Sequence, residues 1–240
     1  MLRRSSRWIA VSSLVIVSAF MLPALAAASQ ITFTGVGRGS QVSITSVGRP
    51  GPDTISVMAG ELNWSFASET PEGFANDFYS YCVDVNQYLS SPQTVTQTSS
   101  TGFTNGAPGG GERAAWLFNT YAAGIHSGPS TTTTNIQAAA LQVAIWETMY
   151  DTNGNLGEGT FILNTTGQIR TQAQIYLNNL FLPGGRYNTS VATILEVISP
   201  NLGQDQIVSR VSEPSTLLLM GVAFLVFARR ARRSPAERRP

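Results

Sequence analysis

The hydrophobic pattern of the chain is densest between Asn135 and Asp151, in the middle of the sequence. Apolar side chains recur there at helical spacing and fall on nearly every face of the predicted helix. A helix that is apolar all round is normally buried, so we expect this segment to form the core of the domain. One polar side chain, Gln142, stands in its middle between alanines and a tryptophan. An unpaired buried amide costs about 1–3 kcal/mol, so Gln142 needs a hydrogen-bond partner elsewhere in the fold.

The rest of the central chain consists mainly of short segments that alternate apolar and polar residues, the pattern of half-buried strands. Strands are predicted over residues 31–36, 41–47, 55–58, 62–66, 79–85, 160–163, 191–198 and 206–211, and residues 93–104 form a strand pair or a loop. Helices are predicted over residues 112–123, 135–151 and 166–180, with a loop over 124–134 and Asn135 as N-cap of the central helix. We therefore predict an α+β fold, in which a β-rich domain carries two or three short helices.

The first 28 residues have the outline of a signal peptide. Arginines at positions 3, 4 and 7 precede an apolar stretch from Trp8 to Leu22, and small residues follow at Ala26 and Ala28. We expect cleavage before Ser29 or after Ala26, with an uncleaved membrane anchor as the alternative. Either arrangement places the central domain outside the cytoplasm.

A second hydrophobic stretch, from Thr216 to Ala228, lies near the C-terminus. A full bilayer span needs about 20 apolar residues, so this segment is short and crosses only a thin membrane. The arginines that follow it are expected to stay on the cytoplasmic side: Arg229, Arg230, Arg232 and Arg233. The domain of residues 29–211 would then face outward, with residues 212–233 in the inner membrane and a basic cytoplasmic tail at 234–240.

Residues 211–233 resemble the PEP-CTERM sorting signal of Gram-negative bacteria, in which a Glu-Pro motif, an apolar helix and an arginine cluster follow in that order. The motif positions here are Glu213, Pro214 and Ser215, while Ser212 stands where the family usually has proline. The resemblance implies an exosortase-type membrane protease as partner and a destination in the cell envelope or exopolysaccharide matrix. An ordinary C-terminal membrane anchor is the alternative.

The charge of the chain is divided unevenly between its parts. All 15 basic residues are arginines, and most of them lie near the two ends. Between residues 29 and 212 there are six arginines and twelve acidic residues, a formal charge of −6. An acidic domain without lysine argues against nucleic-acid binding, which needs a basic surface.

Two short motifs resemble the halves of bacterial Cys–Gln thioester surface domains. The first is Tyr-Cys-Val-Asp at residues 81–84, and the second is Leu-Gln-Val-Ala-Ile-Trp-Glu at residues 141–147. The resemblance implies an internal thioester between Cys82 and Gln142. Its formation needs the sulfur and the carboxamide to be held in contact, because such positioning can lower the activation barrier by on the order of 7–11 kcal/mol. The product would acylate an amine or hydroxyl of a partner.

Cys82, the single cysteine of the chain, is open to other interpretations. A free cysteine often packs as a small buried hydrophobe, with Gln142 bonded to a strand backbone, and an intermolecular disulfide is a third reading. A Cys82–His126 catalytic pair has no supporting signature, because His126 falls in the predicted loop. The spacing of Asp151, Asn153 and Asn155 lacks the glycine and glutamate of a calcium loop, so a turn is favoured.

The sequence therefore predicts an exported bacterial protein that is held at the inner membrane with its domain facing the periplasm, and then reaches the cell surface or extracellular matrix. We expect a structural or adhesive role through Cys82–Gln142, with exopolysaccharide or a surface nucleophile as partner. No metal site, cofactor or catalytic centre is predicted, and the chain is expected to be a substrate of an exosortase rather than an enzyme. A secreted hydrolase or a glycan-binding module is the alternative function.

Overall fold

The computed structural model describes residues 28–46, 54–182, 191–200 and 203–210. The predicted signal peptide and the C-terminal hydrophobic stretch lie outside these residues. No helix within the described ranges is long and apolar enough to cross a membrane.

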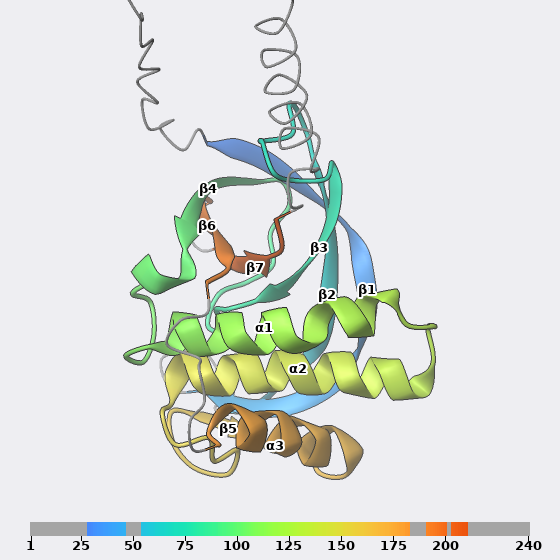
Figure 1. The fold of residues 1–240 in the computed structure, drawn as a ribbon, viewed down its shortest axis with the longest axis vertical. Coiled ribbons are helices and arrows are strands. Elements are labelled where there is room, and N and C mark those ends of the chain that lie inside the picture. The colour runs from blue at the N-terminus through green and yellow to red at the C-terminus, as the bar shows by residue number, and fades with distance from the viewer. Residues whose placement is uncertain (1–27, 47–53, 183–190, 201–202, 211–240) are drawn as a thin grey trace, which may run out of the picture.

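Six antiparallel strands close into a ring (Figure 1). Each neighbour in the order β1-β2-β3-β7-β6-β4 is hydrogen-bonded to the next, and β4 pairs back to β1. The short β5 pairs with the far end of β1 outside this ring. The strands are β1 (Ser29–Ser46), β2 (Thr54–Phe66), β3 (Asp77–Cys82), β4 (Gln93–Ser99), β5 (Phe161–Leu163), β6 (Thr193–Ser199) and β7 (Gln206–Val208).

A small apolar core fills the ring. It takes buried side chains from β1, β2, β4, β6 and β7, among them Ile31, Trp64 and Val95. One polar chain crosses this interior: the indole N–H of Trp64 donates to Ser80 Oγ at 2.9 Å, and Ser80 Oγ donates to Gln206 Oε1 at 2.7 Å. The indole therefore has a partner, as a buried polar group requires.

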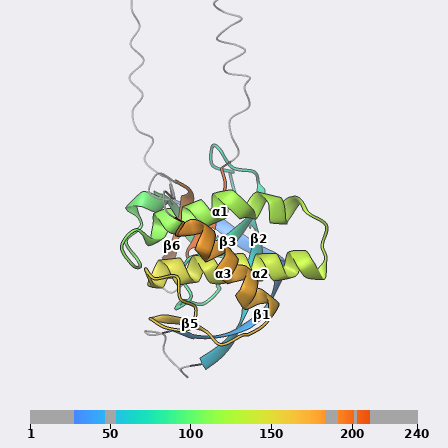
Figure 2. The same cartoon turned by 60° about the horizontal axis from the view of Figure 1, so that its bottom comes forward.

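Three helices form the second layer: α1 (Gly110–Ser127), α2 (Thr132–Tyr150) and α3 (Gln168–Leu180). Helices α1 and α2 run side by side (Figures 1 and 2). Helix α3 lies against them at the end of the molecule opposite the start of β1 (Figure 1). Helix α2 contacts both other helices as well as β1, β2, β3 and β5. Every residue from Ala138 to Met149 is buried, because α2 has protein on all sides. The predicted all-round burial of this helix is confirmed.

The α+β, β-rich fold class is confirmed, but several predicted boundaries were wrong. The separate strands expected at 31–36 and 41–47 are one 18-residue strand, and those at 55–58 and 62–66 are one 13-residue strand. Gly60 interrupts the apolar pattern of β2 without ending it. Its φ of 142° and the close approach of the Arg38 carbonyl leave no room for a Cβ, so glycine is needed for the strand to continue.

The loop expected over residues 124–134 is mostly helical. Helix α1 continues to Ser127, and α2 begins at Thr132 rather than at Asn135. Thr131 is the N-cap: its hydroxyl accepts from the Thr134 N–H, and Thr134 Oγ1 accepts from the Thr131 N–H. This reciprocal capping box satisfies two N–H groups of the first turn, which explains the earlier start.

Candidate functional site

The side chain of Gln142 meets the backbone of Cys82, the last residue of β3. The Cys82 N–H donates to Gln142 Oε1 at 3.0 Å, and Gln142 Nε2 donates to the Cys82 carbonyl at 2.7 Å. Gln142 is 1% exposed and Cys82 is 2% exposed, so the contact is shielded from water. The two predicted site residues, which are 60 positions apart in sequence, are thus in direct contact.

The fold holds both residues from several sides. Cys82 pairs with Gln206 of β7, and the next N–H along the chain, that of Val83, donates to the Asp205 carbonyl at 3.0 Å. Gln142 lies at the middle of α2, where neighbouring helices and strands fix its position. Because a strand end and a packed helix carry the two groups, their relative position is set by the core and not by a loop.

The Cys82 sulfur lies in surroundings that favour the neutral thiol. Sγ donates to the Asp84 carbonyl at 3.0 Å. Burial raises the pKa of the thiol well above its ordinary value, and the carboxylates of Asp84 and Asp205 raise it further. Hydrogen bonds from the Trp146 side chain and from the Asp84 backbone lower it. The resting thiolate is therefore disfavoured, and a reaction of this sulfur depends on groups that offset its burial.

Two carboxyl groups, those of Asp84 and Asp205, lie near Cys82. Asp84 Oδ1 accepts from the Tyr150 hydroxyl at 2.7 Å and from the Asn86 N–H at 2.9 Å. Asp205 Oδ1 accepts from the Val197 N–H at 2.7 Å, and burial raises the pKa of Asp205 to about 7. These bonds fix the loops on either side of the strand end that carries Cys82.

A cavity of about 220 Å³ reaches the Cys82–Gln142 contact. None of the residues that line it carries a charge. Four of its lining residues are among the exposed large hydrophobic side chains of the described ranges, with exposures from 39% to 55%: Val36, Met58, Tyr88 and Leu89. The site is therefore buried but has an apolar approach from the surface.

The sequence predicted Cys82 and Gln142, and it placed Trp146 beside Gln142 on the central helix. It did not identify Tyr150, although Tyr150 follows Trp146 by four residues and so shares its helix face. Asp205 had no such signal, because it reaches Cys82 through the pairing of β3 with β7.

Comparisons with known proteins found matches for the C-terminal segment and for the central domain. Residues 210–233 match the family model of the PEP-CTERM protein-sorting motif. The motif indicates an exported protein that an exosortase sorts to the cell envelope, and its Glu213, Pro214 and Ser215 lie outside the described residues. No curated protein matches the chain.

Two solved structures are similar to the central domain. One is the N-terminal thioester domain of the fibronectin-binding protein SfbI from Streptococcus pyogenes, with 14% identity, a TM-score of 0.38, and coverage of 65% of this chain and 87% of that one. The other is the N-terminal thioester domain of a surface protein from Clostridium perfringens, with 14% identity, a TM-score of 0.39, and coverage of 71% and 99%. The contact of Cys82 with Gln142 is a property of the present chain and does not depend on either similarity.

The other residues considered from sequence have different surroundings. His126 lies in the last turn of α1 and not in a loop, with its ring stacked on Tyr79 at 3.9 Å and Nδ1 3.4 Å from Glu61 Oε2. The Asp151 carboxylate accepts from the N–H groups of Thr160 and Phe161 and so fixes the turn after α2. Within the described ranges, no group of three or more His, Cys, Asp or Glu residues could hold a metal ion.

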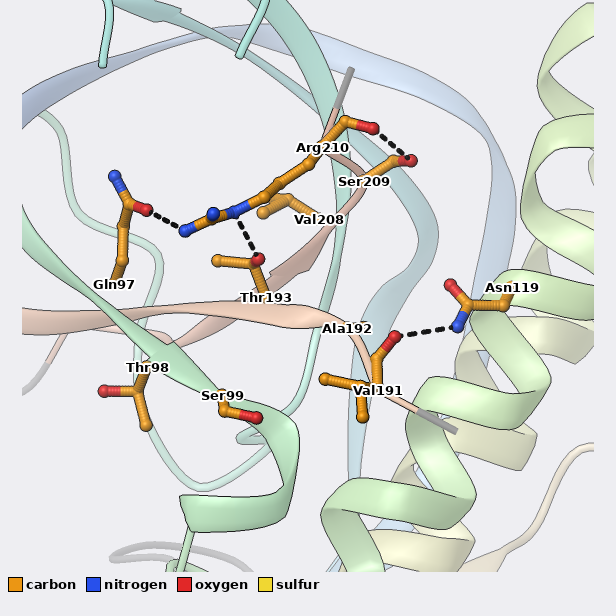
Figure 3. Close-up of a pocket in the computed structure, with 10 residues that line it drawn as sticks. All are labelled: Gln97, Thr98, Ser99, Asn119, Val191, Ala192, Thr193, Val208, Ser209 and Arg210. Carbon is orange, nitrogen blue, oxygen red and sulfur yellow. Dashed lines mark hydrogen bonds between the residues drawn. The ribbon is translucent and has the colours of Figure 1, made fainter. Parts of the chain in front are cut away.

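A second, larger cavity of about 510 Å³ lies between β4, β6, the end of β7 and Asn119 in the middle of α1 (Figure 3). Arg210 crosses it, with Nε donating to Thr193 Oγ1 at 3.1 Å and Nη2 to Gln97 Oε1 at 2.5 Å. Arg210 is also the first residue of the PEP-CTERM match. The side chain thus fastens the start of the sorting segment to the ring.

Proposed function

We propose that this exported protein is a covalent capture module of the cell envelope. In this proposal Cys82 and Gln142 form an internal thioester, and a nucleophile on a surface or matrix partner opens it. The observation that carries the proposal is the pair of hydrogen bonds between the Gln142 carboxamide and the peptide groups of Cys82.

The first of these bonds supports the chemistry directly. An amide is a poor electrophile, and its carbonyl becomes more reactive when a fixed donor stabilises the charge that develops on oxygen. The Cys82 N–H already points at Gln142 Oε1, at 3.0 Å, inside a water-excluded site. The same residue therefore supplies both the nucleophilic sulfur and a donor for the oxyanion.

Thioester formation balances without any further reagent. Cys82 Sγ bonds to Gln142 Cδ, the Cδ–Nε2 bond breaks, and the thiol proton leaves with the nitrogen as ammonia. Capture then forms a bond between Cδ and an amine or hydroxyl of the partner, and returns the sulfur to a thiol. The protein reacts once in this scheme, so it is a reactant and an exosortase substrate rather than an enzyme.

The competing interpretation is that Gln142 simply satisfies the end of β3. Both hydrogen bonds also serve that purpose, since each pairs a buried backbone group. A carboxamide that only packs would remain intact beside a free thiol, and the chemical state of Gln142 separates the two. An intermolecular disulfide would also leave the Gln142 carboxamide intact, so the chemical state of Gln142 distinguishes it from the thioester as well.

The arrangement of the chain ends suits an anchored capture module. The start of β1 and the last described residues after β7, residues 209–210, lie on the same side of the molecule, away from α2 and α3 (Figure 1). We infer that the PEP-CTERM segment holds the protein in the inner membrane until the exosortase acts, and that the domain then reaches the surface or the exopolysaccharide matrix. A tether at that end leaves the helical layer free.

Intact-mass measurement of the protein purified from producing cells tests this function. The wild-type mass is expected to be lower than the sequence mass of the processed chain by one ammonia. Cys82→Ala and Gln142→Ala should both show the full mass, and Gln137→Ala on the same helix should keep the loss. A wild-type protein with the full mass and a titratable thiol would leave only the packing interpretation.

A further inference from the structure

Trp146 places a hydrogen-bond donor, its indole N–H, in the cavity that reaches Cys82 and Gln142. The residue lies one helical turn after Gln142 on α2 and lines the same cavity of about 220 Å³. Its side chain is 2% exposed, and its Nε1–H bonds to no oxygen or nitrogen of the described residues. The group it acts on is the Cys82 thiol, because a hydrogen bond from Trp146 lowers the pKa of that thiol. A buried donor without an oxygen or nitrogen partner costs about 1–3 kcal/mol, so its retention calls for a role.

The orientation of the indole is set by packing. Its ring lies against Phe161 of β5, with ring centroids 6.0 Å apart. The four-residue spacing brings it over the same face of α2 as Gln142. A donor held in this way needs no rearrangement to act on a neighbouring atom, which is the property of groups that stabilise developing charge.

We propose that the Trp146 indole N–H donates a hydrogen bond to the Cys82 thiolate, and so stabilises it, when the thioester opens. This inference rests on the proposed function and assigns the group that makes its sulfur a competent leaving group.

The need for such a donor follows from the other groups around the sulfur. In the neutral thiol Sγ faces the Asp84 carbonyl oxygen, which would repel a thiolate. The carboxylates of Asp84 and Asp205 add negative charge, and the Cys82 N–H is engaged by Gln142 Oε1. Burial raises the pKa of Cys82 most, while a hydrogen bond from the Trp146 side chain lowers it and a hydrogen bond from the Asp84 backbone lowers it less.

The step can be written with its atoms in place. The acceptor nitrogen bonds to Gln142 Cδ, the Cδ–Sγ bond breaks, and its electron pair passes to Sγ. The Trp146 N–H donates to the resulting thiolate until the proton released by the acceptor nitrogen reaches the sulfur. The reverse order applies to thioester formation, so the same donor favours the attacking thiolate.

Two replacements of Trp146 distinguish the effect of its N–H from the effect of its ring shape. Trp146→Phe removes the N–H and part of the ring, and 3-benzothienylalanine at position 146 keeps the bicyclic shape with sulfur in place of the N–H. Methylamine is the probe, and intact mass follows its uptake over time. Trp116→Phe, which changes a partly buried tryptophan on α1, is the control.

Both replacements should slow methylamine uptake by roughly 10- to 100-fold, because removal of a single donor to developing charge has effects of this order or larger. Trp116→Phe should react at the wild-type rate. Uptake within twofold of wild type for the benzothienyl protein would overturn the inference, even if the phenylalanine variant were slow or unfolded. That result would assign the effect to ring shape.

A second readout does not need the thioester. In the Gln142→Ala background Cys82 cannot form one, and the rate at which an alkylating reagent modifies its thiol at one fixed pH can be compared with and without the Trp146 N–H. Because the thiolate is the reactive form, loss of the N–H should slow alkylation, and an unchanged rate would overturn the inference. Absence of the ammonia loss in wild type would instead refute the proposed function, and the alkylation rates would then decide the role of Trp146 alone.

Discussion

Gln142 pairs with both peptide groups of Cys82, accepting from its N–H at 3.0 Å and donating to its carbonyl at 2.7 Å. The pairing joins the end of β3 to the middle of α2, and it answers the question raised by a single amide in an apolar helix. It also brings the carboxamide to the backbone of the only cysteine in the sequence. One contact thus serves the fold and creates the candidate reactive site.

Loss of this pairing should destabilise the domain. Gln142→Leu keeps an apolar side chain of similar size but leaves the N–H and the carbonyl of Cys82 unpaired in the core. The free energy of unfolding should fall by about 2–6 kcal/mol, from a cost of about 1–3 kcal/mol for each of the two unpaired groups. Urea denaturation measures it, with Gln137→Leu on the less buried part of α2 as control. Equal stability of the two variants would contradict the account.

Two substitutions at the start of α2 test which residue is its N-cap: Thr131, as in the structure, or Asn135, as the sequence suggested. Thr131→Ala removes the capping hydroxyl and should destabilise the protein by about 1 kcal/mol. Asn135→Ala, at the position that the sequence suggested as N-cap, should change stability by no more than about 0.5 kcal/mol, as is usual away from special features. Thermal unfolding of both variants checks this, and a larger loss for Asn135→Ala would contradict the observed helix start.

These boundaries illustrate what local pattern predicts and where it stops. The buried helix, its amide and the cysteine strand were predicted, because hydrophobic periodicity and short motifs are local properties of the sequence. The continuity of β2 through Gly60 was missed, since it depends on the close approach of Arg38 from the neighbouring strand. Asp205 was missed for the same reason, as the β3–β7 pairing brings it to Cys82 across more than 120 positions.

Stability should fall as the pH rises from weakly acidic to weakly basic. Burial, followed by the nearby Asp151 carboxylate, raises the pKa of Glu147 from 4.5 to about 8. The folded state keeps this proton up to about pH 8, whereas the unfolded chain releases it above about pH 4.5. Between these values the unfolded state binds fewer protons, so its formation becomes easier as pH increases.

The Glu147→Gln variant removes the titration and should flatten this dependence. Urea unfolding at intervals from pH 5 to pH 8 would measure the slope for wild type and variant. Asp205, whose pKa is raised to about 7, contributes in the same direction and leaves a residual slope. Glu158→Gln, at an exposed position, serves as control and should retain the wild-type slope. An unchanged slope for Glu147→Gln would refute the assignment.

The sorting segment can be tested in cells that express an exosortase. Deletion of residues 216–233 should release the protein into the medium, because both the hydrophobic stretch and the arginine cluster are lost. Glu213→Ala with Pro214→Ala should leave the uncleaved protein in the membrane fraction. Fractionation and immunoblotting distinguish these forms. Membrane retention of the deletion protein would rule out the segment as the anchor.

Peptide mapping of the freshly purified protein under mildly acidic conditions tests the central claim most directly. The peptides that contain Cys82 and Gln142 should appear as one cross-linked species, lighter than their sum by one ammonia. Treatment with methylamine before digestion should separate them, leaving a methylamide on Gln142 and a free thiol on Cys82. Recovery of two separate peptides from the untreated protein, with an intact glutamine and a free cysteine, would contradict the thioester and reduce the site to packing.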